Sequence, residues 1–247
     1  MVEVKPDRSL DPDHVSKTFK VVIFVLRSTL RPGDTLHVTG TENIPIEDPY
    51  VLAFSHHASW WDILASGQAV YNQTKRPVRY MAKEELFRNP VIGPAITAMN
   101  GIPVSKSEYK PEQVQNAVEL LRTGNVVGVG VEGTRTYGPE LAKLRRGAGI
   151  IACLANAQIA PVAIRGMERH IRKKRPTITP PLEVVFGQPV EVPNYYGEFE
   201  AKDLSADKFP RELLRGAIEV GRQLRQNLQE ALDEATARSG NPPRETG

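Results

Sequence analysis

The hydrophobic positions of this chain follow two different patterns. Short runs rich in Val, Ile, Ala and Phe, such as YVLAFS and VVGVGV, alternate with longer segments whose apolar residues recur three and four positions apart. The runs are typical of buried strands, and the longer segments are typical of amphipathic helices. Strands separated by helices predict an α/β fold around a central mixed, largely parallel sheet with helices on its faces.

The predicted elements begin after a turn-rich stretch over residues 40–48. We expect strands over residues 50–55, 78–82, 102–104, 126–131, 160–164 and 182–187. We expect helices over residues 60–71, 90–99, 111–122 and 147–157, and a long amphipathic helix over residues 209–237 that packs on the body.

Residues 14–29 form a separate amphipathic pattern, which ends at Pro32 and Gly33. A helix with this mixture of apolar and basic residues either docks on the core or lies in the headgroup region of a membrane. The pattern leaves both alternatives open.

For the chain as a whole, we expect an N-terminal membrane-association segment over 1–35, a single domain over 36–238 and a disordered tail over 239–247.

Composition limits where the protein acts. The longest apolar runs, residues 21–26 and 150–155, have six residues each, whereas a helix that spans a bilayer needs about 20. We expect no spanning helix, and a location in the cytoplasm, because acidic residues and Pro6 interrupt the region where a leader would be basic and then apolar. The single cysteine, Cys153, lies in an apolar run, which predicts a buried thiol rather than a nucleophile.

The charge of the chain is informative in its distribution. A net charge of +3 gives no argument for a nucleic-acid partner. Residues 165–175, however, carry six Arg and Lys against one Glu. Such a segment either attracts an anionic lipid surface, by about 1 kcal/mol per charge near the interface, or is a solvated loop.

The first cluster of candidate catalytic residues directly follows a predicted buried strand and reads SHHASWWD. His57 and Asp62 lie five positions apart across a strand-to-helix turn, so the carboxylate can accept a hydrogen bond from the imidazole. This arrangement fixes the tautomer and leaves the other ring nitrogen to take a proton. Alternatively, Ser59 and Asp62 form a capping box at the start of the helix, which contributes about 1 kcal/mol of helix stability.

The second cluster, VEGTRTYG over residues 131–138, also follows a predicted buried strand. Gly133 permits a tight turn, Thr134 offers a hydroxyl group, and Arg135 offers a planar fork that matches a phosphate group. Glu132 either pairs with Arg135 or holds an acceptor hydroxyl. The alternative is an ordinary turn with a surface ion pair, worth about 0–1 kcal/mol.

Two lysines extend this basic set. Lys83 and Lys106 each follow a short predicted strand, so both can reach the edge of the sheet where His57 and Arg135 are expected. Three converging cations would bind a phosphate group. Each lysine taken alone is typical of a solvated surface residue.

Four ordered segments between residues 51 and 189 resemble the lysophosphatidic acid acyltransferases, within the wider glycerolipid acyltransferases. HHASWWD resembles the first block, NGIPVSK the second, VEGTRT the third and IAPVAI the fourth, while AKEELF and LRRGAG resemble the linking segments. Three positions differ from the family pattern. His56 stands for the Asn that often precedes the catalytic His, Lys106 for an Arg, and Val131 for a Pro.

The resemblance implies an acyltransferase that moves a fatty acyl group from acyl-CoA or acyl carrier protein to the free hydroxyl of 1-acylglycerol-3-phosphate, giving phosphatidic acid. His57 and Asp62 would be the catalytic pair, and neither an acyl-enzyme, a metal ion nor a cofactor would be required. The protein would act peripherally on the inner face of the membrane. Acceptor binding is implied for seven residues: Lys83, Gly101, Lys106, Glu132, Gly133, Thr134 and Arg135.

Other functions stay open at this point. Lysine at position 106 keeps the positive charge but loses the bidentate fork, which leaves room for another lysophospholipid or a glycolipid acceptor. A thioester hydrolase is disfavoured because the sequence has no G-x-S-x-G elbow. A catalytically inactive lipid-binding module is disfavoured because His57, Asp62, Glu132 and Arg135 are all present.

Overall fold

The computed structural model describes about two thirds of the chain, in several ranges. These are residues 36–55, 60–90, 93–99, 101–105, 111–136, 140–166, 182–195 and 210–239, together with Lys17, Lys20, Val21 and Phe24. Most of the predicted helix over 14–29, most of the basic segment 165–175 and the predicted tail beyond Ser239 therefore lie outside the described residues. So do His57 and Lys106.

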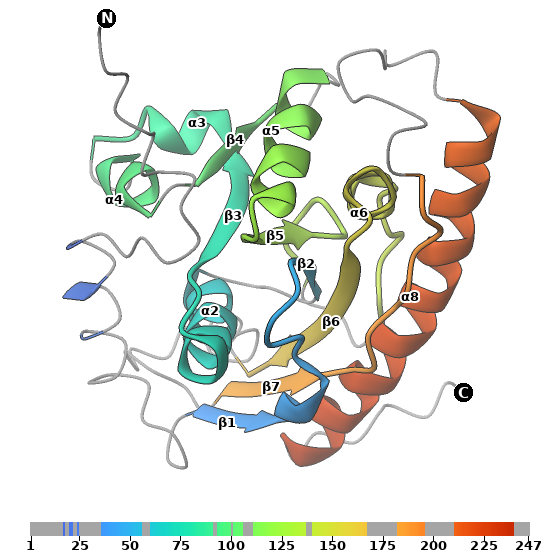
Figure 1. Ribbon diagram of the computed structural model, residues 1–247. Coiled ribbons are helices and arrows are strands. Elements are labelled where there is room, and N and C mark those ends of the chain that lie inside the picture. The colour runs from blue at the N-terminus through green and yellow to red at the C-terminus, as the bar shows by residue number, and fades with distance from the viewer. Residues whose placement is uncertain are drawn as a thin grey trace, which may run out of the picture.

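The described strands form one mixed sheet (Figure 1). Its order is β1 (Leu36–Thr39), β7 (Leu182–Phe186), β6 (Gln158–Arg165), β2 (Tyr50–Ser55), β5 (Val126–Gly130), β3 (Val78–Lys83) and β4 (Ile102–Val104). Every neighbouring pair is parallel except β6 and β7, which are antiparallel. The predicted central mixed, largely parallel sheet is confirmed.

Helices cover both faces of this sheet. The helix α2 (Trp60–Thr74) packs on one face, and α5 (Pro111–Arg122), α6 (Gly147–Ala155) and α8 (Arg211–Arg238) pack on the other. Short α3 (Glu84–Phe87) and α4 (Gly93–Ala98) lie between β3 and β4, and the 3-10 helix η1 (Thr41–Asn43) follows β1. Within the described ranges, no helix combines the length and apolar character that crossing a bilayer requires.

The strand β2 shows why the alternating elements assemble in layers. Val51 and Ala53 face the core under α5, α6 and α8, whereas Leu52 and Phe54 face the core under α2. All four side chains are at most 3% exposed. A strand buried on both faces reads as a continuous apolar run, which is the pattern that predicted it.

Two short elements were not predicted. The strand β1 has the sequence LHVT, and it pairs only with β7 at the edge of the sheet. Its polar His37 and Thr39 give it no run of apolar residues. The helix α3 is a single turn of four residues, and the helix expected over residues 90–99 is the shorter α4. Sequence periodicity identifies long elements well and single turns poorly.

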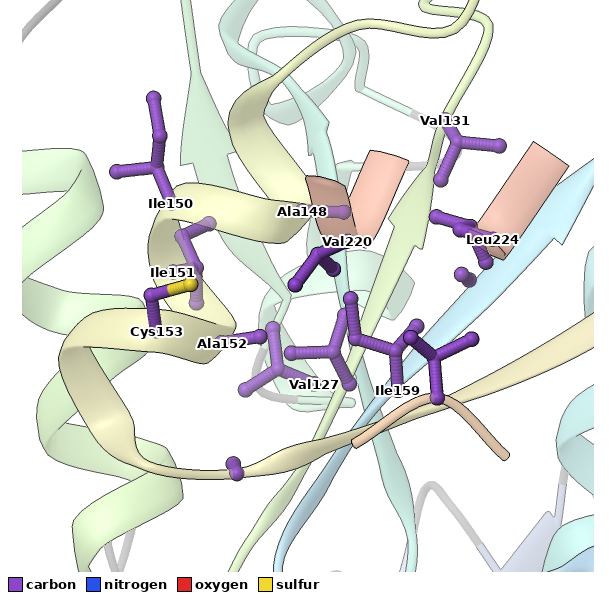
Figure 2. Close-up of a cluster of buried hydrophobic side chains, with 14 of the residues drawn as sticks. Val127, Val131, Ala148, Ile150, Ile151, Ala152, Cys153, Ile159, Val220 and Leu224 are labelled. Atoms are coloured by element: carbon purple, nitrogen blue, oxygen red, sulfur yellow. The ribbon is translucent and has the colours of Figure 1, made fainter. Parts of the chain in front are cut away.

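The predicted burial of Cys153 is confirmed. Its side chain is 0% exposed and lies on α6 beside Ile150 and Ile151 in the larger core cluster (Figure 2). Burial disfavours the charged thiolate and raises the pKa of the thiol to about 11. The thiol is therefore protonated near neutral pH, and it is no candidate for a nucleophile.

The ring of Tyr80 holds α2 against the sheet. A Cβ atom at Gly128 would lie 2.3 Å from Cδ1 of Tyr80, and one at Gly67 would lie 2.8 Å from its hydroxyl oxygen. The hydroxyl group donates to the carbonyl oxygen of Ile63 at 2.9 Å and lies 3.0 Å from Oγ of Ser66. These contacts fix the first turns of α2, which begin at the edge where β2 ends.

We expect Gly128→Ala to lower the free energy of unfolding by about 1–3 kcal/mol, because the new methyl group overlaps the Tyr80 ring and its backbone cannot move away. Thermal denaturation measures the effect. A matched control is Gly221→Ala within α8, where a Cβ atom would meet nothing within 4 Å. This control is expected to be neutral or to stabilise by up to about 1 kcal/mol.

The cost of Gly128→Ala should shrink in a Tyr80→Ala background, because the overlapping ring is then absent. Equal costs for Gly128→Ala and Gly221→Ala, or a cost independent of residue 80, would contradict the explanation. Double-mutant analysis separates the energy of this contact from any general cost of placing alanine in the strand.

Candidate active site

The loops after β2 and β5 leave the sheet side by side. The two strands are parallel neighbours with Phe54 opposite Gly130, and the amide of Val131 donates to the carbonyl oxygen of Phe54 at 3.2 Å. Because parallel strands end at the same edge, residues 56–59, which carry His57, and residues 131–136 start from adjacent points. The structure thus brings Ser55 and Val131, the first residues of the two predicted clusters, to one edge of the sheet.

The strand β3, which ends at Lys83, and the strand β4, which precedes Lys106 in the sequence, end at this edge too. The strand β3 lies parallel to β5, and β4 lies parallel to β3, with Lys83 opposite Val104 in the register. Lys83 is the last residue of β3 and is half-buried. Lys106 itself lies outside the described residues, but the strand that precedes it runs toward the same edge.

Asp62 is the third residue of α2 and is 1% exposed. A carboxylate at the start of a helix is favoured by the partial positive charge of the helix N-terminus. Its position, three residues after position 59, fits both predicted roles, namely orienting His57 and capping the helix with Ser59. Ser59 lies outside the described residues, so the choice between the two roles stays a prediction.

Glu132 holds its own loop together. Glu132 is 3% exposed, and its Oε1 accepts a hydrogen bond from the amide of Ala142 at 2.9 Å. Its Oε2 accepts one from the hydroxyl group of Thr136 at 2.8 Å. The two carboxylate oxygens therefore tie Thr136 and Ala142 to Glu132 beside the end of β5.

Gly133 and Arg135 occupy the turn that Glu132 supports. Gly133 has a φ angle of +68°, in the left-handed region that favours glycine, and a Cβ atom there would lie 3.3 Å from Cγ of Arg145. Thr134 and Arg135 are exposed. The loop thus presents a hydroxyl group and a guanidinium group at the surface of the edge where β2 and β5 end.

Gly101 has a clear backbone role in the structure. Its amide donates to the carbonyl oxygen of Ile96 at 2.9 Å, and a Cβ atom at this position would lie 2.6 Å from Cγ2 of Ile96. Only glycine fits this close approach, which directs the chain from α4 into β4. Contact between Gly101 and a substrate stays a prediction.

Arg165 is a residue at this edge whose position the sequence did not reveal. It was expected within a basic segment that is either solvated or in contact with lipid, but it is the last residue of β6 and is 3% exposed. The register pairs it with Glu183 across the antiparallel β6–β7 ladder, and it lies two residues after Ala163, which pairs with Ser55. The only local signal was its place directly after the apolar run APVAI.

Metal-ligating side chains do not gather in the described ranges, where no group of three or more His, Cys, Asp or Glu is close enough to hold an ion.

The chain is similar to several proteins that share one name. A 1-acyl-sn-glycerol-3-phosphate acyltransferase of Bacillus subtilis is 33% identical over 138 residues, which are 56% of this chain and 65% of that protein. One of Pseudomonas aeruginosa is 29% identical over 134 residues, 53% of this chain and 49% of that protein. The matched part of the chain thus spans less than two thirds of the length of either relative.

A solved structure has the same fold. The 1-acyl-sn-glycerophosphate acyltransferase PlsC of Thermotoga maritima superposes with a TM-score of 0.61 at 23% identity, covering 90% of this chain and 80% of that one. Residues 35–165, just over half of the chain and including the ends of β2, β3, β4 and β5, match the family model described as Acyltransferase. The chain therefore belongs to the acyltransferase family.

Proposed function

We propose that the chain transfers a fatty acyl group from acyl-CoA or acyl carrier protein to the free hydroxyl of 1-acylglycerol-3-phosphate, giving phosphatidic acid. The observation that carries this proposal is the common edge at which β2 and β5 end, where Ser55, two positions before His57 in the sequence, lies near Glu132 and the exposed Arg135. The names of the similar proteins support the choice of acceptor.

The proposed reaction uses His57 as general base. Its free ring nitrogen takes the proton of the acceptor hydroxyl as the oxygen attacks the thioester carbonyl carbon. The new ester C–O bond forms, the C–S bond breaks, and the departing thiolate takes the proton from the imidazolium. Asp62, buried at the start of α2, orients the ring and stabilises its charged form. This scheme needs no acyl-enzyme, metal ion or cofactor.

The acceptor phosphate is proposed to bind the basic groups of the same edge. Arg135 supplies a planar fork that can donate two parallel hydrogen bonds, and Lys83 and Lys106 supply point charges. Glu132 contributes by holding the loop, since its two oxygens are bound to Ala142 and to Thr136. Gly133, Thr134 and Gly101 would shape the pocket around the headgroup.

A membrane surface is the proposed location of the substrates. Both a lysophospholipid and its product are amphiphilic, so the enzyme would work peripherally on the inner face of the membrane, with residues 1–35 as the associating segment, 36–238 as the acyltransferase domain and 239–247 as a tail. The proposal involves no nucleic acid. Lysine at position 106 favours testing other lysophospholipid and glycolipid acceptors alongside 1-acylglycerol-3-phosphate.

Purified protein with a long-chain acyl-CoA and 1-acylglycerol-3-phosphate is expected to release free CoA and form phosphatidic acid. The variant His57→Ala is expected to have a kcat lower by about 10²–10⁴-fold, because general-base catalysis contributes a factor of this size. Release of CoA and mass spectrometry of the lipid product measure this. His37→Ala on β1 is the control, because His37 is bound to Glu183 and is not part of the proposed site.

The outcomes separate the candidate functions. Release of CoA without an acceptor would indicate a thioester hydrolase. Binding to anionic vesicles without turnover of any lysolipid or glycolipid would indicate an inactive lipid-binding module. Full activity of His57→Ala would contradict the proposed mechanism.

Arg135→Lys is expected to raise the KM for the acceptor by about tenfold while the KM for acyl-CoA changes little, because lysine keeps the charge and loses the bidentate geometry. Steady-state kinetics with each substrate varied in turn measures the effect. Arg211→Lys at the exposed start of α8 is the matched control. An equal rise in both KM values would argue against a specific contact between Arg135 and the acceptor.

A further inference from the structure

The strand β4 is weakly held by its own ladder. It has three residues at the edge of the sheet, and among the described strands it pairs with β3 alone, through Met81–Ile102, Ala82–Pro103 and Lys83–Val104. Pro103 has no N–H group to donate, and a short edge strand gains little from so few rungs. The chain that continues from β4 toward Lys106 therefore requires another support.

The side chain of Gln113 supplies that support just beyond the last rung. Its Oε1 accepts a hydrogen bond from the amide of Ser105 at 3.0 Å, and its Nε2 donates one to Oε1 of Glu84 at 3.1 Å. Ser105 is the first residue after β4, and Glu84 is the first residue after β3. One amide group thus joins the two chains at the point where backbone pairing stops.

Gln113 is itself firmly placed. It lies in the first turn of α5 and is half-buried, and the next residues on the inner face of this helix, Val114, Ala117 and Val118, are at most 8% exposed in the core. The hydrogen bond to Glu84 has a carboxylate as acceptor, which makes it stronger than a bond between neutral groups. The bridge is therefore anchored to the body of the fold and not to a loop.

Each partner of the bridge is adjacent in the sequence to a lysine of the proposed phosphate site. Lys83 directly precedes Glu84, and Lys106 directly follows Ser105. We infer that Gln113 is a positioning residue: by fixing Ser105 relative to Glu84, it holds the ends of β4 and β3 together beside Lys83 and thereby sets the affinity for the phosphate group of the acceptor. This inference rests on the proposed function. It assigns to Gln113 no contact with the substrate.

The test compares Gln113→Leu, which keeps the size of the side chain and removes both hydrogen bonds, with Gln115→Leu, an exposed position on the same helix. For Gln113→Leu, the KM for 1-acylglycerol-3-phosphate is expected to rise about tenfold, while kcat and the KM for acyl-CoA stay within about twofold. Gln115→Leu is expected to leave all three constants unchanged. A purely structural role would not separate the two KM values.

A donor–acceptor exchange provides a second, independent readout. Gln113→Glu still accepts from Ser105 but places a carboxylate against Glu84, so the acceptor KM is expected to rise. Adding Glu84→Gln restores a donor opposite the new carboxylate and also restores the net charge. The double variant is expected to recover most of the acceptor affinity that Gln113→Glu alone loses.

The possible failures are distinguishable. Absence of turnover by the wild-type protein with every lysophospholipid would contradict the proposed function, and the inference with it. An active wild type whose Gln113→Leu variant has an unchanged acceptor KM would overturn the inference alone. A parallel fall in kcat and a rise in both KM values, together with a lower Tm and no recovery in the exchanged pair, would overturn it as well.

Discussion

The hydrogen bond from the Val131 amide to the Phe54 carbonyl oxygen extends the parallel pairing of β2 and β5 to the point where both strands end. Residues 77 positions apart in the sequence thereby start their loops next to each other. The rest of the candidate site adds to this contact, with Asp62 at the start of α2, Glu132 closing the loop after β5, and β3 with β4 alongside. A shift in this register would separate the two clusters, whatever their residue types.

The candidate site is bordered by polar side chains whose hydrogen bonds hold neighbouring segments of the fold together. The two carboxylate oxygens of Glu132 accept hydrogen bonds from the Thr136 hydroxyl group and the Ala142 amide. The hydroxyl group of Tyr80 donates to the carbonyl oxygen of Ile63, the residue after Asp62. Gln113 joins the ends of β3 and β4. Reactive groups on loops gain geometric precision when neighbouring side chains are fixed by packing and hydrogen bonds. The described part of the chain shows one such group at each of three loops.

The sequence predicted those parts of the fold whose residues are buried on both sides. YVLAFS reads as a strand because each of its residues is buried, and the register then follows from the parallel arrangement. The strand β1 escaped prediction because an edge strand of four residues with His37 and Thr39 has no distinctive pattern. The bridge of Gln113 could not be predicted either, since its two partners lie 8 and 29 positions away and a glutamine on an amphipathic helix normally faces solvent. Arg165 was misjudged because a basic neighbour sequence hid a buried strand end.

The reversed direction of β7 and β1 determines where the polypeptide joins the body. The strand β7 begins opposite the end of β6, and Leu36 of β1 pairs with Leu182 at the beginning of β7. The first residue of the sheet therefore lies at the same rim at which β2, β5 and β6 finish. Any attachment to a surface that is made through the residues before Leu36 would consequently act close to the rim that carries the candidate site.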